Sequence, residues 1–437
     1  MKDKFNINNL FQKIYFFISF LYTLVLPIIV MVMYSFNLYS DVLFYWHFLT
    51  FLMSILSIII FIFDIKINKG KIKKFKQIKY PLLFFSLFFV WVILSTIFSS
   101  DTSLSLFGDG YRANGLVQFF SYIGYAILGI SLNKENRIRI LRIICYVSFV
   151  MAILNLFGNY NIFPNFYKYS AIFSHFNHYA YYLVYTIVIS IFLFFYDKNK
   201  ILKLSDFIIY LTLIYMLIVN DTFGCYLAIF LIMIFVFIYC FKKKIMIQYL
   251  FIFLAFIFIS MFTKINDNYL VYNNFKKLFY DIGVIKYEIS NNETSIENIE
   301  NSQIMYVGTN RGMLWINAIK FIKEKPIFGY GLDNLGYKYM ENNITINMPH
   351  NLILGLSATI GIPGMLFYIF SVLLVLIKGF KNLKNGDHII NLPYFVIVSH
   401  LISSMFGNTM YYVTPYYVII LGMGMLYLNE KKVLSSN

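Results

Sequence analysis

Long apolar runs alternate with short polar segments along most of the chain. Each run is close to the roughly 20 apolar residues that an α-helix needs to cross a lipid bilayer. Twelve such runs cover residues 14–36, 43–63, 80–99, 116–132, 139–157, 179–196, 206–221, 223–241, 245–262, 351–377, 389–407 and 411–428. The pattern therefore predicts an all-α integral membrane protein with about 12 transmembrane helices.

Along the chain, every second polar segment between these runs is basic. With the N-terminus placed inside, the basic segments on the inner side are residues 64–79, 133–142, 197–205, 242–244 and 378–388. Lysine and arginine are enriched in the cytoplasmic loops of membrane proteins. The alternation predicts a multi-pass protein of the cytoplasmic (inner) membrane, with both termini cytoplasmic.

One polar segment is much longer than the others. Residues 263–350 fall on the predicted outer side and contain nine basic and nine acidic residues, so the segment is neutral. Within it, "NRGMLWINAIKFIKEK" (310–325) has apolar residues at helical spacing with charges between them, which indicates an amphipathic helix on the outer face. We expect a membrane domain of nine helices (1–262), this extracytoplasmic segment (263–350), and a second membrane part (351–437).

The second membrane part begins with an interrupted run. In "NMPHNLILGLSATIGIPG" (347–364) the apolar residues follow "PHN" and are broken by "GIPG". Glycine and proline favour a break in a helix, so we expect a short re-entrant helix from about 351 to 359 and a full span from Ile362. Irregular backbone at membrane depth is tolerated where it lines a cavity or is buried in protein. The sequence therefore predicts a cavity near this break.

Composition narrows the class of function. Hydrophobic residues make up 60% of the 437 residues and charged residues 13%, whereas soluble domains average about 25% charged residues. The net charge of +16 comes from loops between apolar runs, so no separate basic domain is present and no nucleic-acid partner is expected. The three cysteines lack CxxC spacing, and no GxxxxGKS, HExxH or GxSxG motif occurs. Neither a metal nor a cofactor is expected.

Polar residues that a plain helical bundle does not need collect on the predicted outer face. Ionisable residues at membrane depth are costly, and their default interpretation is functional. The candidate site residues are Arg112, His178, Asp221, Arg311, Asp333, His350 and Asn351. His400 is different because it lies inside the run 389–407, where a hydrogen bond between helices is the simpler role.

Most of these candidates also fit structural roles. The alternatives are a lipid-phosphate contact for Arg112, an interfacial anchor for His178, a helix cap for Asp221, a turn closure for Asp333 and a plain surface charge for Arg311. An idle loop role suits His350 least, because its setting between proline, asparagine and an apolar run is so specific.

A guanidinium and an imidazole on one face suit a group-transfer reaction. Arginine binds phosphates through parallel charge-assisted hydrogen bonds, and histidine takes a proton from a hydroxyl near neutral pH. Such a pair fits a reaction in which a lipid pyrophosphate leaves while a hydroxyl attacks. Cationic side chains then neutralise the departing charge without a metal.

The stretch that carries both groups resembles the O-antigen ligase and polymerase superfamily. The usual order in this family is an arginine, a nearby tryptophan, "P-(L/I)-F-G-x-G", His-Asn, and a glycine-rich helix start. The matching positions here are Arg311, Trp315, residues 326–331, His350-Asn351 and residues 361–364. The segment "FGDGYRANG" (107–115), which contains Arg112, is similar to a glycine-flanked arginine that the family often has.

The resemblance implies a metal-independent membrane glycosyltransferase. Such an enzyme passes a glycan from undecaprenyl pyrophosphate to a saccharide or glycolipid acceptor (ligase), or to another lipid-linked repeat unit (polymerase), at the outer face of the membrane. Arg311 would hold the pyrophosphate, and His350 would act as the base or orient the acceptor. The implied substrate-binding residues are Arg112, Asn351, Asp333, His178 and Asp221.

One position departs from the ligase pattern. Ligases commonly have "S-R-G" in the short outer loop before the eighth helix, whereas this chain has "DTFGCY" (221–226), with Phe223 in place of the arginine. Arg112 is the candidate for the second positive charge. The sequence leaves open whether the chain is a ligase or a polymerase, which sugar and acceptor it uses, and its oligomeric state.

Two other classes of function remain open. A transporter or flippase of lipid-linked saccharides would show charges at mid-membrane and symmetry between its halves, and neither is clear in the sequence. A structural partner in a glycan-assembly complex would tolerate the loss of both Arg311 and His350.

Overall fold

The computed structural model describes residues 2–35, 39–68, 78–109, 113–159, 171–173, 175–265, 268–281, 311–346, 348–384, 387–407 and 413–425. Helices dominate these ranges. Two strands, β1 (Lys264–Ile265) and β2 (Asn268–Tyr269), form one short antiparallel hairpin. The predicted all-α class is confirmed for this part of the chain.

The helices follow one another in short steps along the chain. They are α1 (Lys2–Phe20), the π-helical η1 (Leu21–Val25), α2 (Leu26–Ser35), α3 (Tyr39–Ile67), α5 (Lys79–Ile97), α6 (Thr102–Phe107), α7 (Leu116–Ser131), α8 (Lys134–Asn159), α9 (Phe176–Tyr196), α10 (Lys200–Val219), α11 (Phe223–Lys243), α12 (Met246–Phe262), α13 (Leu270–Asp281), an unlabelled helix over 311–324, α15 (Leu335–Glu341), α16 (Leu352–Lys381), α17 (His388–Ser403), the 3₁₀ turn η3 (Ser404–Phe406) and α18 (Thr414–Met425).

Nine helical segments among the described residues are long and apolar enough to cross a membrane. They are Ile7–Met33, Tyr45–Ile67, Lys79–Ile97, Lys134–Phe157, Phe176–Tyr196, Lys200–Val219, Phe223–Lys243, Leu352–Lys381 and His388–Phe406. Three shorter apolar helices, α7, α12 and α18, fall on the other three predicted runs. The chain is thus an α-helical, multi-pass type of protein, while the count of 12 spans and the side of each terminus stay predictions.

Polar side chains mark where several helices begin. The carboxylate of Asp101 accepts a hydrogen bond from the Leu104 amide at the start of α6, and Asp387 does the same for Ile390 at the start of α17. Asn199 caps α10 in the same way. Such caps satisfy amide groups that have no partner within the helix, so these short polar segments set the helix boundaries.

The centre of the bundle is α9, which is buried along nearly its whole length. It packs against α8, α10, α11 and α17. Beside this core, α7 crosses α18 closely at two glycines. A Cβ atom at Gly129 would lie 1.9 Å from the carbonyl oxygen of Ile419, and one at Gly422 would lie 2.2 Å from that of Ala126. Small residues let helix backbones approach in this way.

Two arginines of the basic segment 133–142, the buried Arg137 and the half-buried Arg142, form structural contacts. The guanidinium of Arg137 donates to the carbonyl oxygens of Leu132, Gly129 and Met423 at 2.9, 3.4 and 3.2 Å. These carbonyls belong to the ends of α7 and α18, where a helix carries partial negative charge. Arg142 forms an ion pair with Asp197 at 2.8 Å. Part of the charge that predicts the inner side therefore also binds the helices together.

The helix break predicted at 361–364 is present at Gly361. This residue has φ 79° and ψ 166°, so α16 consists of two helices joined by one non-helical residue. Because of the break, the carbonyl groups just before Gly361 lose the backbone amides that would bind them in a continuous helix. The amides of Tyr330 and Gly331 donate to the carbonyl oxygens of residues 358 and 359 at 2.9 and 2.8 Å, and the indole of Trp91 donates to that of residue 360 at 3.0 Å.

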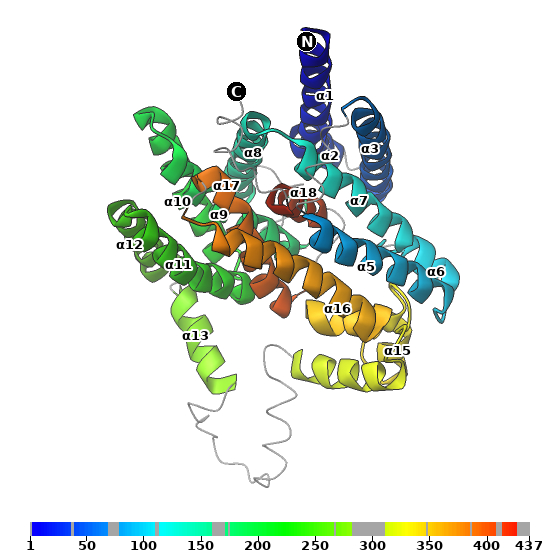
Figure 1. Ribbon diagram of the computed structural model, residues 1–437. Coiled ribbons are helices and arrows are strands. Elements are labelled where there is room, and N and C mark those ends of the chain that lie inside the picture. The colour runs from blue at the N-terminus through cyan, green and yellow to red at the C-terminus, as the bar shows by residue number, and fades with distance from the viewer. Residues whose placement is uncertain are drawn as a thin grey trace, which may run out of the picture.

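The turn over 326–331 therefore fills the gap in α16. In return, the Ile362 amide of α16 donates a hydrogen bond to the carbonyl oxygen of Pro326 in the turn, at 2.9 Å. The hydroxyl of Ser95, on α5, donates to both Phe328 and Thr359. Figure 1 shows α16 lying along α5, with α15 next to its first half.

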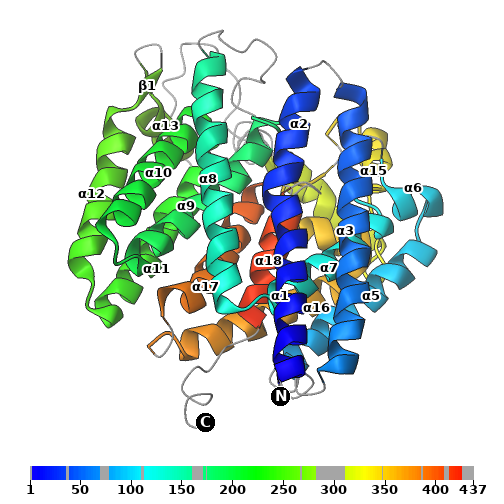
Figure 2. The same ribbon diagram turned by 90° about the horizontal axis from the view of Figure 1, so that it is seen from above.

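The amphipathic helix predicted over 310–325 is helical from 311 to 324. Its apolar side joins a small separate core. The buried members of this core are Leu314, Phe321, Tyr330, Leu335, Tyr339, Ile344 and Ala358. In Figure 2 the hairpin strand β1 and α13 lie at the end of the bundle opposite the start of α1. Whether that end faces outward stays a prediction.

Replacing Gly361 with alanine should unfold this junction. The new Cβ would lie 1.8 Å from the carbonyl oxygen of Ile327, and φ is positive at this position. We expect a loss of about 2 kcal/mol or more in stability, seen as a lower melting temperature of the purified protein. Gly355→Ala is the matched control, because a Cβ there meets only Pro349 Cγ at 3.7 Å. Equal melting temperatures for the two variants would contradict this account of the break.

Candidate functional site

The "PHN" segment starts α16 and fastens it to the end of α17. The side-chain oxygen of Asn351 accepts a hydrogen bond from the Leu354 amide at 3.1 Å and so caps the helix. Its side-chain nitrogen donates to the carbonyl oxygen of Met405, in η3, at 3.3 Å. Asn351 therefore fixes the position of the preceding residue, His350, relative to two helices.

Three of the predicted site residues have an uncommon backbone conformation. His350, Asp333 and Asp221 have φ values of 51°, 57° and 59°. Positive φ costs energy in residues other than glycine, and such strain clusters at functional sites. The half-buried His350 is held in this conformation by contacts on both sides of it.

Arg311 shares a helix with a tryptophan that binds Pro349, the residue before His350. The indole nitrogen of Trp315 donates to the carbonyl oxygen of Pro349 at 2.9 Å. Arg311 precedes Trp315 by four residues on the same helix, and residues four apart share a helix face. The helix over 311–324 therefore brings its arginine to the side from which it contacts the "PHN" segment.

Arg311 and Trp315 line a cavity of about 670 Å³, which we call the arginine cavity. Its charged lining residues are Arg311, Lys277 from α13, and Asp221. The carboxylate of Asp221 accepts a hydrogen bond from the side chain of Asn274 at 2.6 Å. Two cations against one carboxylate leave a net positive charge, which makes this cavity suited to an anion such as a pyrophosphate.

Phe223 occupies the position where the resemblance expects an arginine, and it also lines the arginine cavity. Its ring packs edge-on against Phe275 of α13, with centroids 5.2 Å apart. This contact brings α13, and with it Lys277, to the cavity. Lys277 was missed by the sequence analysis, although the amphipathic pattern of 270–281 was the available signal.

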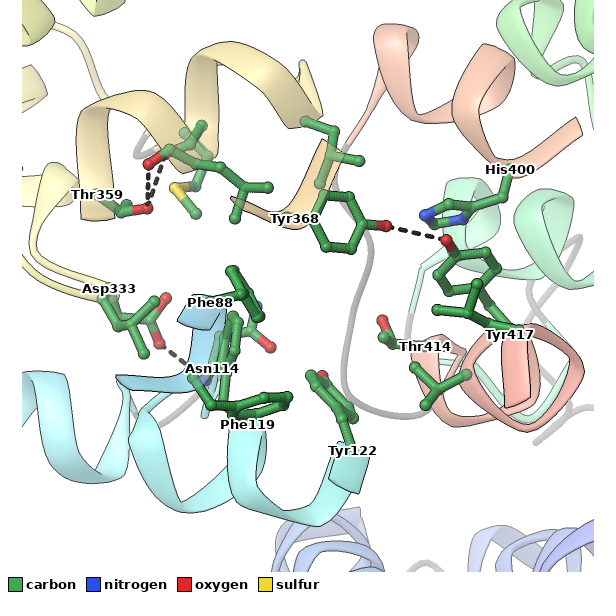
Figure 3. Close-up of a pocket in the computed structure, with 18 of the residues that line it drawn as sticks. Phe88, Asn114, Phe119, Tyr122, Asp333, Thr359, Tyr368, His400, Thr414 and Tyr417 are labelled. Atoms are coloured by element: carbon green, nitrogen blue, oxygen red, sulfur yellow. Dashed lines mark hydrogen bonds between the residues drawn. The ribbon is translucent and has the colours of Figure 1, made fainter. Parts of the chain in front are cut away.

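A second cavity, of about 120 Å³, lies on the other side of the "PHN" segment. We call it the aromatic cavity, because α5, α7, α16 and α18 contribute seven aromatic rings to its wall. Figure 3 shows Asp333 and Asn114 at one end, His400 and Tyr417 at the other, and Phe88, Phe119 and Tyr122 between them.

Residues 404–407, which we call the dividing segment, separate the two cavities. Phe406 lines the arginine cavity and Gly407 lines the aromatic cavity. Gly407 packs directly on the hydroxyl of Tyr181, since a Cβ there would lie 1.3 Å from that oxygen. The "PHN" segment crosses the same boundary, because Pro349 is bound by Trp315 of the arginine cavity while Asn351 lines the aromatic cavity. His350 stands between them in the chain and itself lines neither cavity.

Asp333 joins the turn after the 311–324 helix to the segment before α7. One carboxylate oxygen accepts hydrogen bonds from the backbone amides of Asp109 and Asn114, at 3.1 and 2.9 Å. This bridging contact is a structural role, and a function for the acid at this position stays a prediction. Arg112, which lies between Asp109 and Asn114 in the sequence, is outside the described residues.

Two further predicted site residues, His178 and Asp221, lie in different surroundings. His178 is buried in the first turn of α9 and lines neither of the two cavities. Its ring is 5.3 Å from that of His175, whose side chain caps α9 and whose pKa is lowered by burial. Asp221 lines the arginine cavity, and Thr222 occupies the N-cap position of α11 without a side-chain cap hydrogen bond.

The fold and the two cavities define a class: an α-helical membrane protein with a cationic cavity, an aromatic cavity, and a strained histidine whose two chain neighbours each contact one side. Residues 208–369 match the family model described as O-antigen ligase. Over this stretch, a little over a third of the chain, the sequence is similar to the O-antigen ligase family, as the "R…W…PIFGYG…HN" pattern indicated. No curated protein matches the chain.

The family match indicates an enzyme of the O-antigen ligase or polymerase type, and thus a membrane glycosyltransferase. The matched stretch contains Asp221, Arg311, Asp333 and the His350-Asn351 pair. It ends before the dividing segment and before His400. Lipid and glycan are therefore plausible partners, whereas a transporter or flippase is not favoured.

Removing the Asp333 carboxylate should loosen the segment that it bridges. Asp333→Gly keeps positive φ accessible but loses two hydrogen bonds to a charged acceptor, each contributing roughly 1.5–3 kcal/mol. We expect trypsin to cleave after Arg112 at least about tenfold faster than in the unchanged protein. Asp221→Gly makes the same exchange at another positive-φ aspartate and should leave the cleavage rate unchanged. Equal cleavage rates for the two variants would exclude the bridging role.

Proposed function

We propose that the protein transfers a glycan from undecaprenyl pyrophosphate to a saccharide acceptor, as a polysaccharide ligase or polymerase, at the outer face of the cytoplasmic membrane and without a metal. The observation that carries the proposal is the position of His350. Its neighbour Pro349 is bound from the arginine cavity, and its neighbour Asn351 lines the aromatic cavity. A base at such a boundary lies where a donor and an acceptor would meet.

The arginine cavity supplies the charge that a leaving pyrophosphate needs. Arg311 binds phosphate oxygens through its planar fork of donors, and Lys277 adds a second cation. The favourable interaction grows as the bond to the sugar breaks and the phosphate oxygen gains charge, which is the condition for catalysis. Lys277 therefore takes the role for which the sequence offered Arg112.

The transfer step balances without a further reactant. The acceptor hydroxyl gives its proton to His350, and its oxygen forms a bond to the anomeric carbon of the donor sugar. The bond between that carbon and the phosphate oxygen breaks, and its electron pair leaves with undecaprenyl pyrophosphate. Asn351 holds the histidine in position through its cap and its bond to η3.

Replacing the cations should slow transfer in proportion to their share in binding the leaving group. Purified protein in lipid nanodiscs is given lipid-linked repeat units, with and without a candidate acceptor. We expect Arg311→Ala to lower the rate by about 100-fold or more, and Lys277→Ala by about tenfold, because each removes charge stabilisation from the transition state.

The matched controls are Lys320→Ala, an exposed lysine on the same helix as Arg311, and Lys276→Ala, the neighbour of Lys277. Both should retain the rate of the unchanged protein. A rate for Arg311→Ala within twofold of the controls would rule out the proposal. Elongation without an added acceptor would identify a polymerase, and transfer only with one would identify a ligase.

The pH dependence separates two roles for His350. A base works only in its neutral form, so protonation at low pH removes it and the rate should fall as the pH drops from about 8 to about 5. His350→Gln keeps a polar group of similar reach but has no titrating ring. Its residual rate should not depend on pH in that range. A flat profile in the unchanged protein would make His350 an orienting group instead of a base.

A further inference from the structure

We propose that the aromatic cavity is a saccharide-binding subsite that holds one pyranose ring of the acceptor, with His400 as a hydrogen-bond partner of its hydroxyls. This inference rests on the proposed function and gives it a place for the second substrate. It also assigns a role to the one histidine that the sequence analysis treated as a contact between helices.

The wall of the cavity has the two kinds of surface that a sugar ring needs. A pyranose presents C–H groups on its faces and hydroxyls around its edge. In Figure 3 the rings of Phe88, Phe119 and Tyr122 lie between polar groups at both ends of the cavity. Binding sites for small polar molecules commonly combine apolar aromatic walls with a few placed hydrogen-bonding groups.

His400 is the most specific of these polar groups. Its side chain is 2% exposed, and its ring stacks on Tyr417 with centroids 3.6 Å apart. Nδ1 is 2.6 Å from the hydroxyl of Tyr185. Among the described residues Nε2 has no hydrogen-bond partner, and the ring lines the cavity.

The Tyr185–His400 pair fits a hydroxyl in particular. If Tyr185 donates to Nδ1, Nε2 carries the proton and donates; if Nδ1 donates to Tyr185, Nε2 accepts. A hydroxyl can meet either state, because it is both donor and acceptor. A polyprenyl chain has no such group and would leave a buried ring nitrogen unsatisfied, which is costly.

The size of the cavity limits what it holds. About 120 Å³ is similar to the roughly 150 Å³ cavity that holds one benzene ring. The space therefore suits one ring of a saccharide, with the rest of the chain extending outside.

The position of the cavity identifies the acceptor as the occupant. The cations that would bind the leaving pyrophosphate lie on the other side of the dividing segment. In a displacement, the attacking oxygen and the leaving oxygen lie on opposite sides of the reacting carbon. The acceptor should thus be held opposite the arginine cavity, next to Asn351 and His350.

The binding test uses the full chain in phospholipid nanodiscs free of alkyl glycoside detergents. Methyl pyranosides of glucose, galactose, mannose, rhamnose and N-acetylglucosamine serve as probes, and saturation-transfer NMR reports which ring protons contact the protein. We expect at least one probe to bind, and His400→Phe to weaken that binding at least tenfold. Phenylalanine keeps the stacking on Tyr417 but removes both ring nitrogens.

A second histidine on the same helix provides the control. His388 also pairs with a tyrosine, since its Nδ1 is 2.8 Å from the hydroxyl of Tyr239, but it lines neither cavity. His388→Phe should bind the probe as well as the unchanged protein does. No binding of any probe by the unchanged protein, or equal binding by both variants, would overturn the proposal.

A filling variant tests the cavity without touching a hydrogen bond. Gly355 lines the cavity, and a Cβ there would meet only Pro349 Cγ, at 3.7 Å. Gly355→Leu should abolish probe binding, whereas Gly355→Ala should weaken it much less. Unchanged binding in Gly355→Leu would place the saccharide elsewhere, even if the His400 variant failed to fold.

Kinetics separate this inference from the proposed function. If both hold, Gly355→Leu raises the KM for the acceptor and leaves that for the lipid-linked donor unchanged. A raised KM for the donor alone would overturn the acceptor subsite while leaving transfer itself intact. Probe binding without any transfer by the unchanged protein would instead reject the proposed function and keep the saccharide site.

Discussion

An interrupted helix leaves carbonyl groups without partners along its own axis, and in apolar surroundings each of them needs a donor from elsewhere. In α16 the break at Gly361 frees the carbonyls of residues 358–360, and the amides of the 326–331 turn supply most of the donors. This exchange fastens the segment after the 311–324 helix to the membrane part of the chain. The positions of Trp315 and of the "PHN" segment depend on that attachment, so both cavities depend on one broken helix.

The sequence was informative wherever the signal is local. Apolar runs predicted the helices, and "GIPG" predicted the break, because hydrophobic spacing and glycine or proline act within a few residues. The site depends on contacts between distant residues, such as those of Asp333 with Asn114 and of Tyr185 with His400. No local pattern encodes these pairs. The same limit explains why Lys277 was missed and why Arg137 was counted only as a loop charge.

The stretch that matches the family model includes the charged residues of one cavity but only part of the wall of the other. The matched stretch contains the charged residues of the arginine cavity and the "PHN" segment. The aromatic cavity takes much of its wall from α5, α7 and α18, which lie outside that stretch. In the proposed reaction, the departure of pyrophosphate thus depends on charged residues within the matched stretch 208–369. The choice of acceptor relies mainly on helices that the family model does not reach.

The dividing segment has a consequence for the order in which the protein is made. Residues 404–407 leave the ribosome after Arg311, His350 and all of α16, yet they form the boundary between the two cavities. A nascent chain that has inserted α16 still lacks Met405, to which Asn351 is fastened. Both cavities are therefore complete only when α17 and η3 have joined the bundle, so an incompletely translated chain lacks the finished wall of each.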